Sequence, residues 1–157
     1  MVTARSSIHD TTCVWSKLEG SIEVDPADPG AGAVAELRVD MRVFDAGDRL
    51  KNWKLKGDLE PDKHPTAVFR LARLADVRPG AAGDLQAAAA GALSWRGRTT
   101  QITAPGSGHL DPTSLSADAT FELDVRTLGV TPPKILMFKV ESVVLIKVSL
   151  RAQALPP

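Results

Sequence analysis

The feature that most constrains the fold is a period-two pattern over residues 33–43, in which apolar and charged residues alternate strictly from Ala35 to Val43. Apolar side chains occupy every second position: Ala35, Leu37, Val39, Met41 and Val43. The positions between them carry charge on every residue. A period of two predicts a β-strand with one wet face and one dry face. Eleven residues are long for a small sandwich but normal for a tilted barrel strand.

Further strands are expected along the rest of the chain. Residues 115–125 repeat the alternation, and shorter stretches at 11–15, 18–24, 66–71, 99–103 and 143–150 also favour strand. The stretch at 11–15 is less clear, because Val14 shares the parity of Leu18, whereas Cys13 and Trp15 share the other parity. Either a bulge near Gly20 or a strand buried on both faces would reconcile them. Pro105 and Gly106 are expected to end the strand at 99–103. The segment 134–139 allows one helical turn or an irregular cover.

One stretch is ambiguous between helix and strand. Residues 84–95 contain four consecutive alanines, which have high helix propensity. The same stretch alternates between inward and outward positions and is bracketed by Gly83 and Gly91. Its neighbours are strands, so we interpret it as a strand. The total is about eight strands.

The insertion at residues 44–71 interrupts the strand pattern. Its first part can form a short helix that carries Leu50, Trp53 and Leu55, whereas Pro61–Pro65 cannot be helix or central strand. Antiparallel strands with one apolar face close as an up-and-down barrel or a sandwich. We therefore predict an all-β fold in a single domain over residues 1–157, with this insertion covering one end or a seam.

Composition excludes several classes of protein. The 19 basic and 19 acidic residues balance, which argues against a general nucleic-acid binder, because such proteins need a basic face. The single cysteine, Cys13, cannot form an internal disulfide. No apolar segment follows Met1, so we expect no signal peptide, no membrane span and a cytoplasmic protein.

Catalytic and metal-binding patterns are weak. His9 and Cys13 would lie about 13 Å apart on a strand, too far for one metal ion. His64 and His109 are expected in loops. There is no Gly-x-Ser-x-Gly elbow. Three aspartates around the expected helix suit turn and cap roles better than paired acids: Asp45, Asp48 and Asp58. We expect no cofactor, no metal and no enzymatic activity.

Several segments follow one another in a characteristic order. A strand ends in Phe44-Asp45-Ala46-Gly47-Asp48, a helical stretch follows, and Asp58-Leu59-Glu60 leads through His64-Pro65 to Phe69. Further on come Gly91-Ala92-Leu93-Ser94-Trp95-Arg96-Gly97-Arg98-Thr99 and Phe121–Gly129. In their motifs and their order these segments resemble the YceI-like family. The resemblance covers most of the chain and is weakest over residues 1–30.

The resemblance implies an eight-stranded antiparallel lipocalin-like β-barrel with a short helical insertion. It also implies non-enzymatic binding, transport or sequestration of a long apolar or amphiphilic molecule, typically a polyisoprenoid or fatty amphiphile. Family members are mostly periplasmic or secreted. The free strand edges of such a barrel also allow a homodimer.

Apolar residues at dry-face positions are the expected ligand-binding residues. They are Leu37, Val39, Met41, Leu50, Trp53, Leu55, Phe69, Leu71, Trp95, Phe121 and Leu123. The insertion residues among them would form a lid over an open lumen or a plug in a closed one. The alternative function is a protein-interaction or regulatory barrel with a filled core, marked by an exposed apolar patch beside Trp53.

Overall fold

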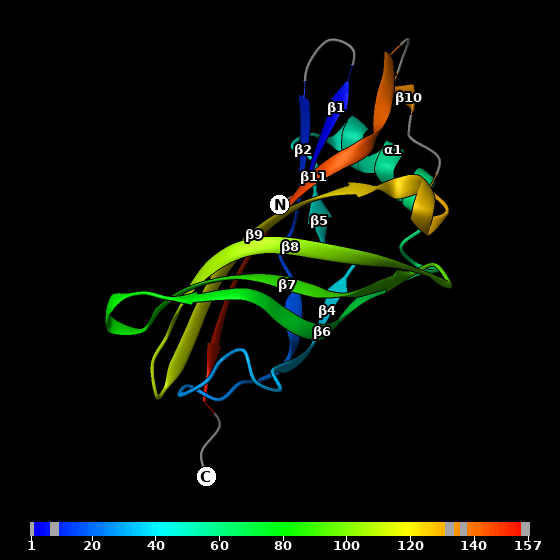
Figure 1. The fold of residues 1–157 in the computed structure, drawn as a ribbon. Helices are drawn as coiled ribbons and strands as arrows, with labels where there is room; N and C mark the ends of the chain where they lie inside the picture. The colour runs from blue at the N-terminus through cyan, green and yellow to red at the C-terminus, as the bar shows by residue number, and fades with distance from the viewer. Residues whose placement is uncertain (1, 7–9, 131–133, 136–137, 155–157) are drawn as a thin grey trace.

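The protein is a curled antiparallel sheet with one helix at one end (Figure 1). The computed structural model describes residues 2–6, 10–130, 134–135 and 138–154. The elements, in chain order, are β1 (Val2–Ser6), β2 (Asp10–Trp15), β3 (Leu18–Glu23), β4 (Val34–Asp40), β5 (Phe44–Asp45), α1 (Arg49–Leu59), β6 (Thr66–Pro79), the 3-10 turn η1 (Ala81–Gly83), β7 (Asp84–Trp95), β8 (Arg98–Leu110), β9 (Ser114–Asp124), the 3-10 turn η2 (Val125–Leu128), β10 (Lys134–Ile135) and β11 (Phe138–Gln153).

The sheet curls into a half-barrel. Its strand order is β3-β4-β6-β7-β8-β9-β11-β1-β2-β5, with β10 paired to β11. In the described part of the chain, β3 pairs only with β4, and residues 147–153 of β11 pair only with β9. Strand β1 covers the first half of β11. An open seam therefore runs between β3 and the second half of β11. The predicted all-β antiparallel barrel is confirmed, although short strands raise the count above eight.

The strand predicted at 33–43 ends earlier than its alternation suggested. The side chain of Asp40 accepts a hydrogen bond from the backbone N–H of Arg42 (3.0 Å), and the Val43 N–H donates to the Asp40 carbonyl (3.3 Å). These bonds turn the chain at Asp40, and Val43 is exposed. An aspartate that bonds the backbone two residues ahead competes with the strand ladder.

The expectation that Pro105 and Gly106 end a short strand was wrong. Strand β8 continues to Leu110, and Pro105 pairs with Ala88 of β7. On its other side β8 pairs with β9 only from Gly106 onward among the described residues. Pro105 therefore lies where that side of β8 is an edge, which is where a sheet tolerates the missing N–H.

The ends of the chain add pairing that the pattern did not predict. Strand β1 pairs with both β2 and β11. Residues 134–135 and 138–139 pair with each other as β10 and the start of β11, in place of the expected helical turn or irregular cover. The chain leaves the strand at residues 16–17, between β2 and β3, and the β3–β4 register is unbroken, so the bulge considered near Gly20 is not present. The Ala-rich segment is strand β7, as predicted.

Helix α1 is fixed at both ends. The Asp48 side chain caps its first turn by accepting from the Lys51 N–H (2.8 Å), and Glu60 ends it in the left-handed conformation (φ 49°). Beyond the helix, Arg96 Nη1 donates to the Leu59 carbonyl (2.7 Å), and Trp95 Nε1 donates to the His64 carbonyl (2.8 Å). The β7–β8 turn therefore holds α1 against this end of the half-barrel.

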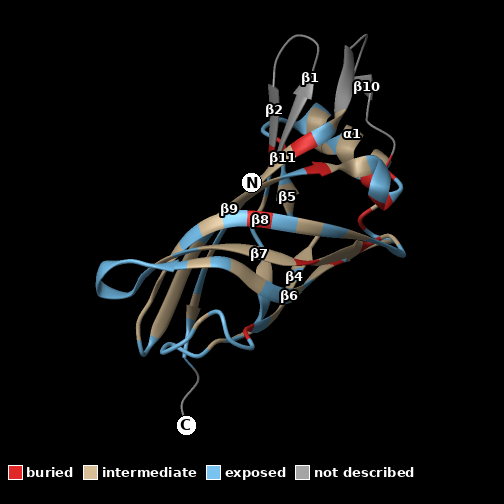
Figure 2. Cartoon of the chain, viewed as in Figure 1, coloured by how far each residue is buried: buried red, intermediate tan, exposed pale blue. Residues whose placement is uncertain are grey.

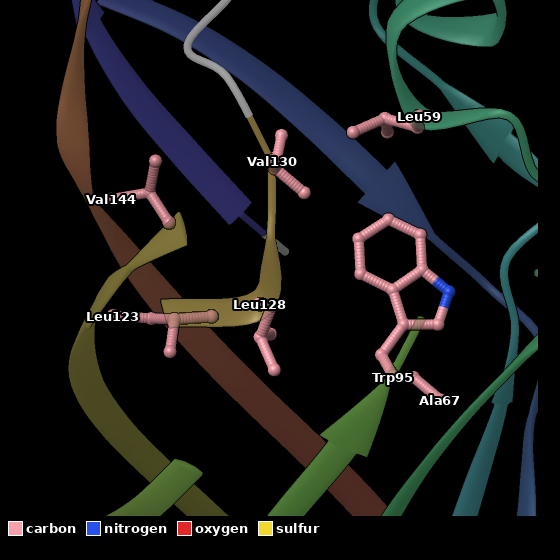
Figure 3. Packing of buried hydrophobic residues seen from close by; sticks show 7 residues of the cluster. All are labelled: Leu59, Ala67, Trp95, Leu123, Leu128, Val130 and Val144. Atoms are coloured by element: carbon pink, nitrogen blue, oxygen red, sulfur yellow. The ribbon is translucent and has the colours of Figure 1, made fainter. Parts of the chain in front are cut away.

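The best-packed part of the interior lies at the same end as α1. Figure 2 shows most of the buried residues near α1, η2 and the adjoining strand ends. Figure 3 shows the cluster itself: Leu59, Ala67, Trp95, Leu123, Leu128, Val130 and Val144. No large side chain among the described residues is wholly buried. The fold is thus closed by packing at one end and less completely filled elsewhere.

Candidate functional site

A cavity of about 160 Å³ occupies the other half of the interior. Seven strands or their flanking loops line it: β3, β4, β6, β7, β8, β9 and β11. Nearly all the lining is apolar. The lining residues are Ile22, Val24, Ala33, Ala35, Leu37, Phe69, Leu71, Leu74, Leu85, Ala87, Ala89, Ala104, Gly106, Ser107, Gly108, Leu110, Leu115, Ala117, Asp118, Ala119 and Leu150.

The cavity exists because small residues face each other on three adjacent strands. Ala87 of β7 pairs with Gly106 of β8, which pairs with Ala119 of β9. Two residues further along β8, Gly108 pairs with Leu85 of β7 and with Ala117 of β9. Ala89 pairs with Ala104. Three strands thus present mostly glycine and alanine to the same space. Their side chains are too small to fill it.

The two glycines of β8 are required by close backbone approach. A Cβ on Gly106 would lie 2.4 Å from the Asp118 carbonyl oxygen, and one on Gly108 would lie 2.7 Å from the Ser116 carbonyl oxygen. Real Cβ atoms do not tolerate such distances. Any side chain here would push β8 and β9 apart, so this wall of the cavity has to stay bare.

The opposite wall carries the larger side chains. Leu37 of β4 pairs with Phe69 of β6, and Ala35 pairs with Leu71. The ring of Phe69 lies over Gly91 of β7, where a Cβ would be 2.8 Å from the ring. The missing side chain of Gly91 leaves room for this ring, which forms part of the cavity wall.

The cavity has no charged side chain directed into it by the strand alternation. Its two polar lining residues, Ser107 and Asp118, occupy outward positions beside the inward Gly106, Gly108, Ala117 and Ala119. The Asp118 carboxylate accepts a hydrogen bond from Ser149 Oγ on the neighbouring strand. Backbone approach at the glycines explains why these two residues reach the cavity. A site of this kind favours apolar surface.

The structure separates the predicted ligand-binding residues into three groups. Leu37, Phe69 and Leu71 line the cavity. Trp95 and Leu123 belong to the buried cluster, against which Val39, Met41, Leu55 and Phe121 pack. Leu50 and Trp53 are exposed, by 57% and 73%.

The insertion residues split because α1 is apolar on two faces. Leu55 and Leu59, four residues apart, share the face that packs on the barrel. Leu50 and Trp53, three residues apart, share the opposite face. The plug is therefore formed by Leu55 and Leu59, and the other two residues point away from the interior.

Several lining residues were not among the predicted ones. The small residues of β7, β8 and β9 form the cavity, but a sequence pattern that looks for large apolar side chains passes over them. The signal that could have found them is the run Ala87–Ala90 followed by Gly106-Ser107-Gly108. Both place small residues at inward positions. Arg96, which holds α1, was also missed.

The ionisable groups with shifted pKa lie outside the cavity. Burial, followed by the nearby Asp45, raises the pKa of the Cys13 thiol to about 12. Hydrogen bonds from Arg42 lower the pKa of Asp40 to about 2, and bonds from Thr113 and Ser114 lower that of Asp111 to about 2. The pKa shifts of the two aspartates come from hydrogen bonds within turns, and that of Cys13 comes mainly from its burial.

The remaining candidate residues have structural roles or lie outside the described residues. Asp48 caps α1, and Asp45 Oδ1 accepts from the Gly47 N–H (2.8 Å), as the sequence predicted for turn and cap residues. Asp58 Oδ1 lies 3.2 Å from Lys54 Nζ. His9 is outside the described residues. The described residues contain no group of three His, Cys, Asp or Glu placed to hold a metal ion.

Comparisons with known proteins place this geometry among related structures. The sequence model of the YceI-like domain matches residues 2–152. The structure is similar to that of BcnA from Burkholderia cenocepacia, with 23% identity, 96% of this chain and 94% of that chain covered, and a TM-score of 0.76. No curated protein matches the sequence.

Two more distant structures share the fold. The Campylobacter jejuni YCEI protein has 10% identity, coverage of 96% and 88%, and a TM-score of 0.73. A polyisoprenoid binding domain from Saccharophagus degradans, implicated in plant cell wall breakdown, has 13% identity, coverage of 98% and 92%, and a TM-score of 0.71.

Among the described residues, no helix is long and apolar enough to cross a membrane.

Proposed function

This chain belongs to the YceI-like domain family, and from that premise we propose that it binds one end of a long apolar molecule, such as a polyisoprenoid, in the cavity between β6, β7, β8 and β9. One observation carries the proposal: the inward rows of alanine and glycine that keep about 160 Å³ empty between seven strands. A neighbour of the same fold is named as a polyisoprenoid binding domain, which supports this class of ligand.

The volume bounds what the cavity holds as it stands. An apolar cavity of about 150 Å³ stays dry and accepts a molecule the size of benzene. The space in this protein therefore suits about one isoprene unit or a short alkyl segment. The remainder of a longer chain would extend along the seam between β3 and the second half of β11, where neither strand has a second partner in the described residues.

Binding would be driven by apolar area. Each methylene removed from water contributes about 0.8 kcal/mol before association costs. Since strand alternation directs no charged side chain into the cavity, the affinity would follow chain length and width and would depend little on the head group. Carriage or sequestration of the ligand, without chemical change, fits a site that lacks catalytic groups.

Native mass spectrometry of the purified protein tests the proposal. The experiment compares the protein as isolated, after organic extraction, and after incubation with prenyl alcohols of increasing length and with fatty amides. We expect a one-to-one complex whose affinity rises with chain length. A protein that is isolated empty and binds none of these molecules would contradict the proposal.

A further inference from the structure

We propose that the exposed face of α1 docks the protein on an anionic lipid surface. This face, called the Trp53 face below, consists of Arg49, Leu50, Trp53, Lys54, Lys56 and Gly57. The proposal concerns a surface at the packed end of the half-barrel and does not depend on ligand binding in the cavity.

The Trp53 face places two large apolar side chains side by side in solvent. Trp53 is 73% exposed and Leu50 is 57% exposed, the largest exposed fractions among the large apolar residues described. They are three residues apart on the helix and therefore neighbours on its surface. Gly57, four residues after Trp53, leaves the space beside the indole open. Trp and Leu on one helix face are the residues that enter the boundary between head groups and acyl chains.

Basic residues border the apolar pair on both sides. Arg49 and Lys56 are each one turn away from Trp53, and Lys54 is one turn away from Leu50. Lys54 lies 3.2 Å from Asp58, whereas neither Arg49 nor Lys56 forms an ion pair within the described part of the chain. The chain as a whole has no net charge, so the positive charge is a local property of this face. Its complement is a negatively charged surface with an apolar layer beneath.

The helix is held so that this face stays outward. Leu55 packs on the buried cluster and Leu59 belongs to it, while Arg96 Nη1 binds the Leu59 carbonyl at 2.7 Å. Docking would therefore need no unfolding of α1. A second copy of the chain is a poorer occupant, because a two-fold interface would set Arg49 and Lys56 against the same residues of the partner.

Vesicle flotation with the full chain tests the proposal. We compare vesicles of phosphatidylcholine alone with vesicles containing about one third phosphatidylglycerol, at about 0.1 M salt, where charges act over about 10 Å. We expect binding to the anionic vesicles only, and its loss in high salt. The emission of Trp53 should shift to shorter wavelength on binding. Trp53→Phe should remove that shift and still float.

Matched variants separate this surface from general charge effects. Arg49→Gln with Lys56→Gln should weaken binding about 25-fold, at about fivefold for each basic residue near the membrane. Trp53→Ala should weaken it about tenfold. The control is Arg73→Gln with Arg78→Gln, which removes the same charge from exposed positions on β6 and should change binding less than twofold.

Two results would overturn the proposal. One is wild-type protein that fails to float with anionic vesicles. The other is a concentration-dependent dimer that Trp53→Ala converts to monomer, which would assign this face to a second copy. Each variant is first checked for a parental circular dichroism spectrum and melting temperature, since all the changed side chains are exposed or partly exposed.

Discussion

Filling the cavity with a leucine at position 89 should weaken ligand binding about 50-fold without unfolding the protein. Ala89 faces the cavity from β7, between Leu74 of β6 and Ala104 of β8. Leucine adds three carbons to alanine. If these displace about three ligand methylenes at about 0.8 kcal/mol each, binding loses about 2.4 kcal/mol, or about 50-fold in Kd.

The same substitution should leave the free energy of unfolding almost unchanged. The three added carbons gain about 2.4 kcal/mol of apolar burial, and crowding costs about 1–3 kcal/mol. The net change is about 1.5 kcal/mol or less in either direction, which for a chain of this length is a shift of about 6 °C or less.

The assay is a titration with a prenyl alcohol, followed by calorimetry or fluorescence, together with thermal unfolding. The matched control is Ala88→Leu, the next residue on β7, which is on the other face of the strand and does not line the cavity. We expect parental affinity in the control and about 50-fold weaker binding in Ala89→Leu. Equal affinity in both variants and the parent would refute the proposed site, and equal loss in both would refute its location.

Three further predictions concern stability and reactivity. Trp95→Phe should lower the free energy of unfolding by about 1–2 kcal/mol, measured by urea titration, because the partly buried hydrogen bond to the His64 carbonyl is lost; ligand affinity should persist, and an unchanged stability would contradict the packing described. The hydrogen bonds to Asp111 lower its folded pKa to about 2, so their stabilisation is complete above about pH 4 and is lost as the pH falls through about 2. Asp111→Asn should therefore flatten the pH dependence of unfolding between those values, and an unaltered slope would exclude this turn as its source. The Cys13 thiol, with its pKa raised to about 12, should react with a thiol reagent at pH 8 about a thousandfold more slowly in the folded than in the unfolded protein, and equal rates would contradict its burial.

The sequence was sufficient for the strand pattern because alternation is a local signal. The apolar positions of β4, β7 and β9 follow directly from a period of two. The end of β4 did not, since the hydrogen bond from Arg42 to Asp40 depends on a side-chain conformation. The course of β8 through Pro105 also depended on which neighbour lies beside it, and that is a property of the assembled sheet.

The site was only partly predictable because a cavity is the space left by residues distant in sequence. Leu37, Phe69 and Leu71 could be named as inward residues. Whether they meet other large side chains depends on Gly106 and Gly108, which face them from another part of the curled sheet. The orientation of α1 could not be predicted for a similar reason. The pair Leu50 and Trp53 would suit the barrel as well as the pair Leu55 and Leu59. The hydrogen bond from Arg96 to the Leu59 carbonyl forms in the structure with the second pair inward.

The division of the interior into a packed end and a hollow end follows from competing demands. An apolar hollow leaves its lining side chains without packing partners, and this lowers stability. The cluster around Trp95 and Leu128 offsets that cost, and the polar bonds of Trp95 and Arg96 fix the segment that covers it. Because these groups lie away from the alanine and glycine rows, the hollow end can vary in width while the packed end keeps the sheet curled. Selection for a different ligand would therefore act on β7, β8 and β9 first.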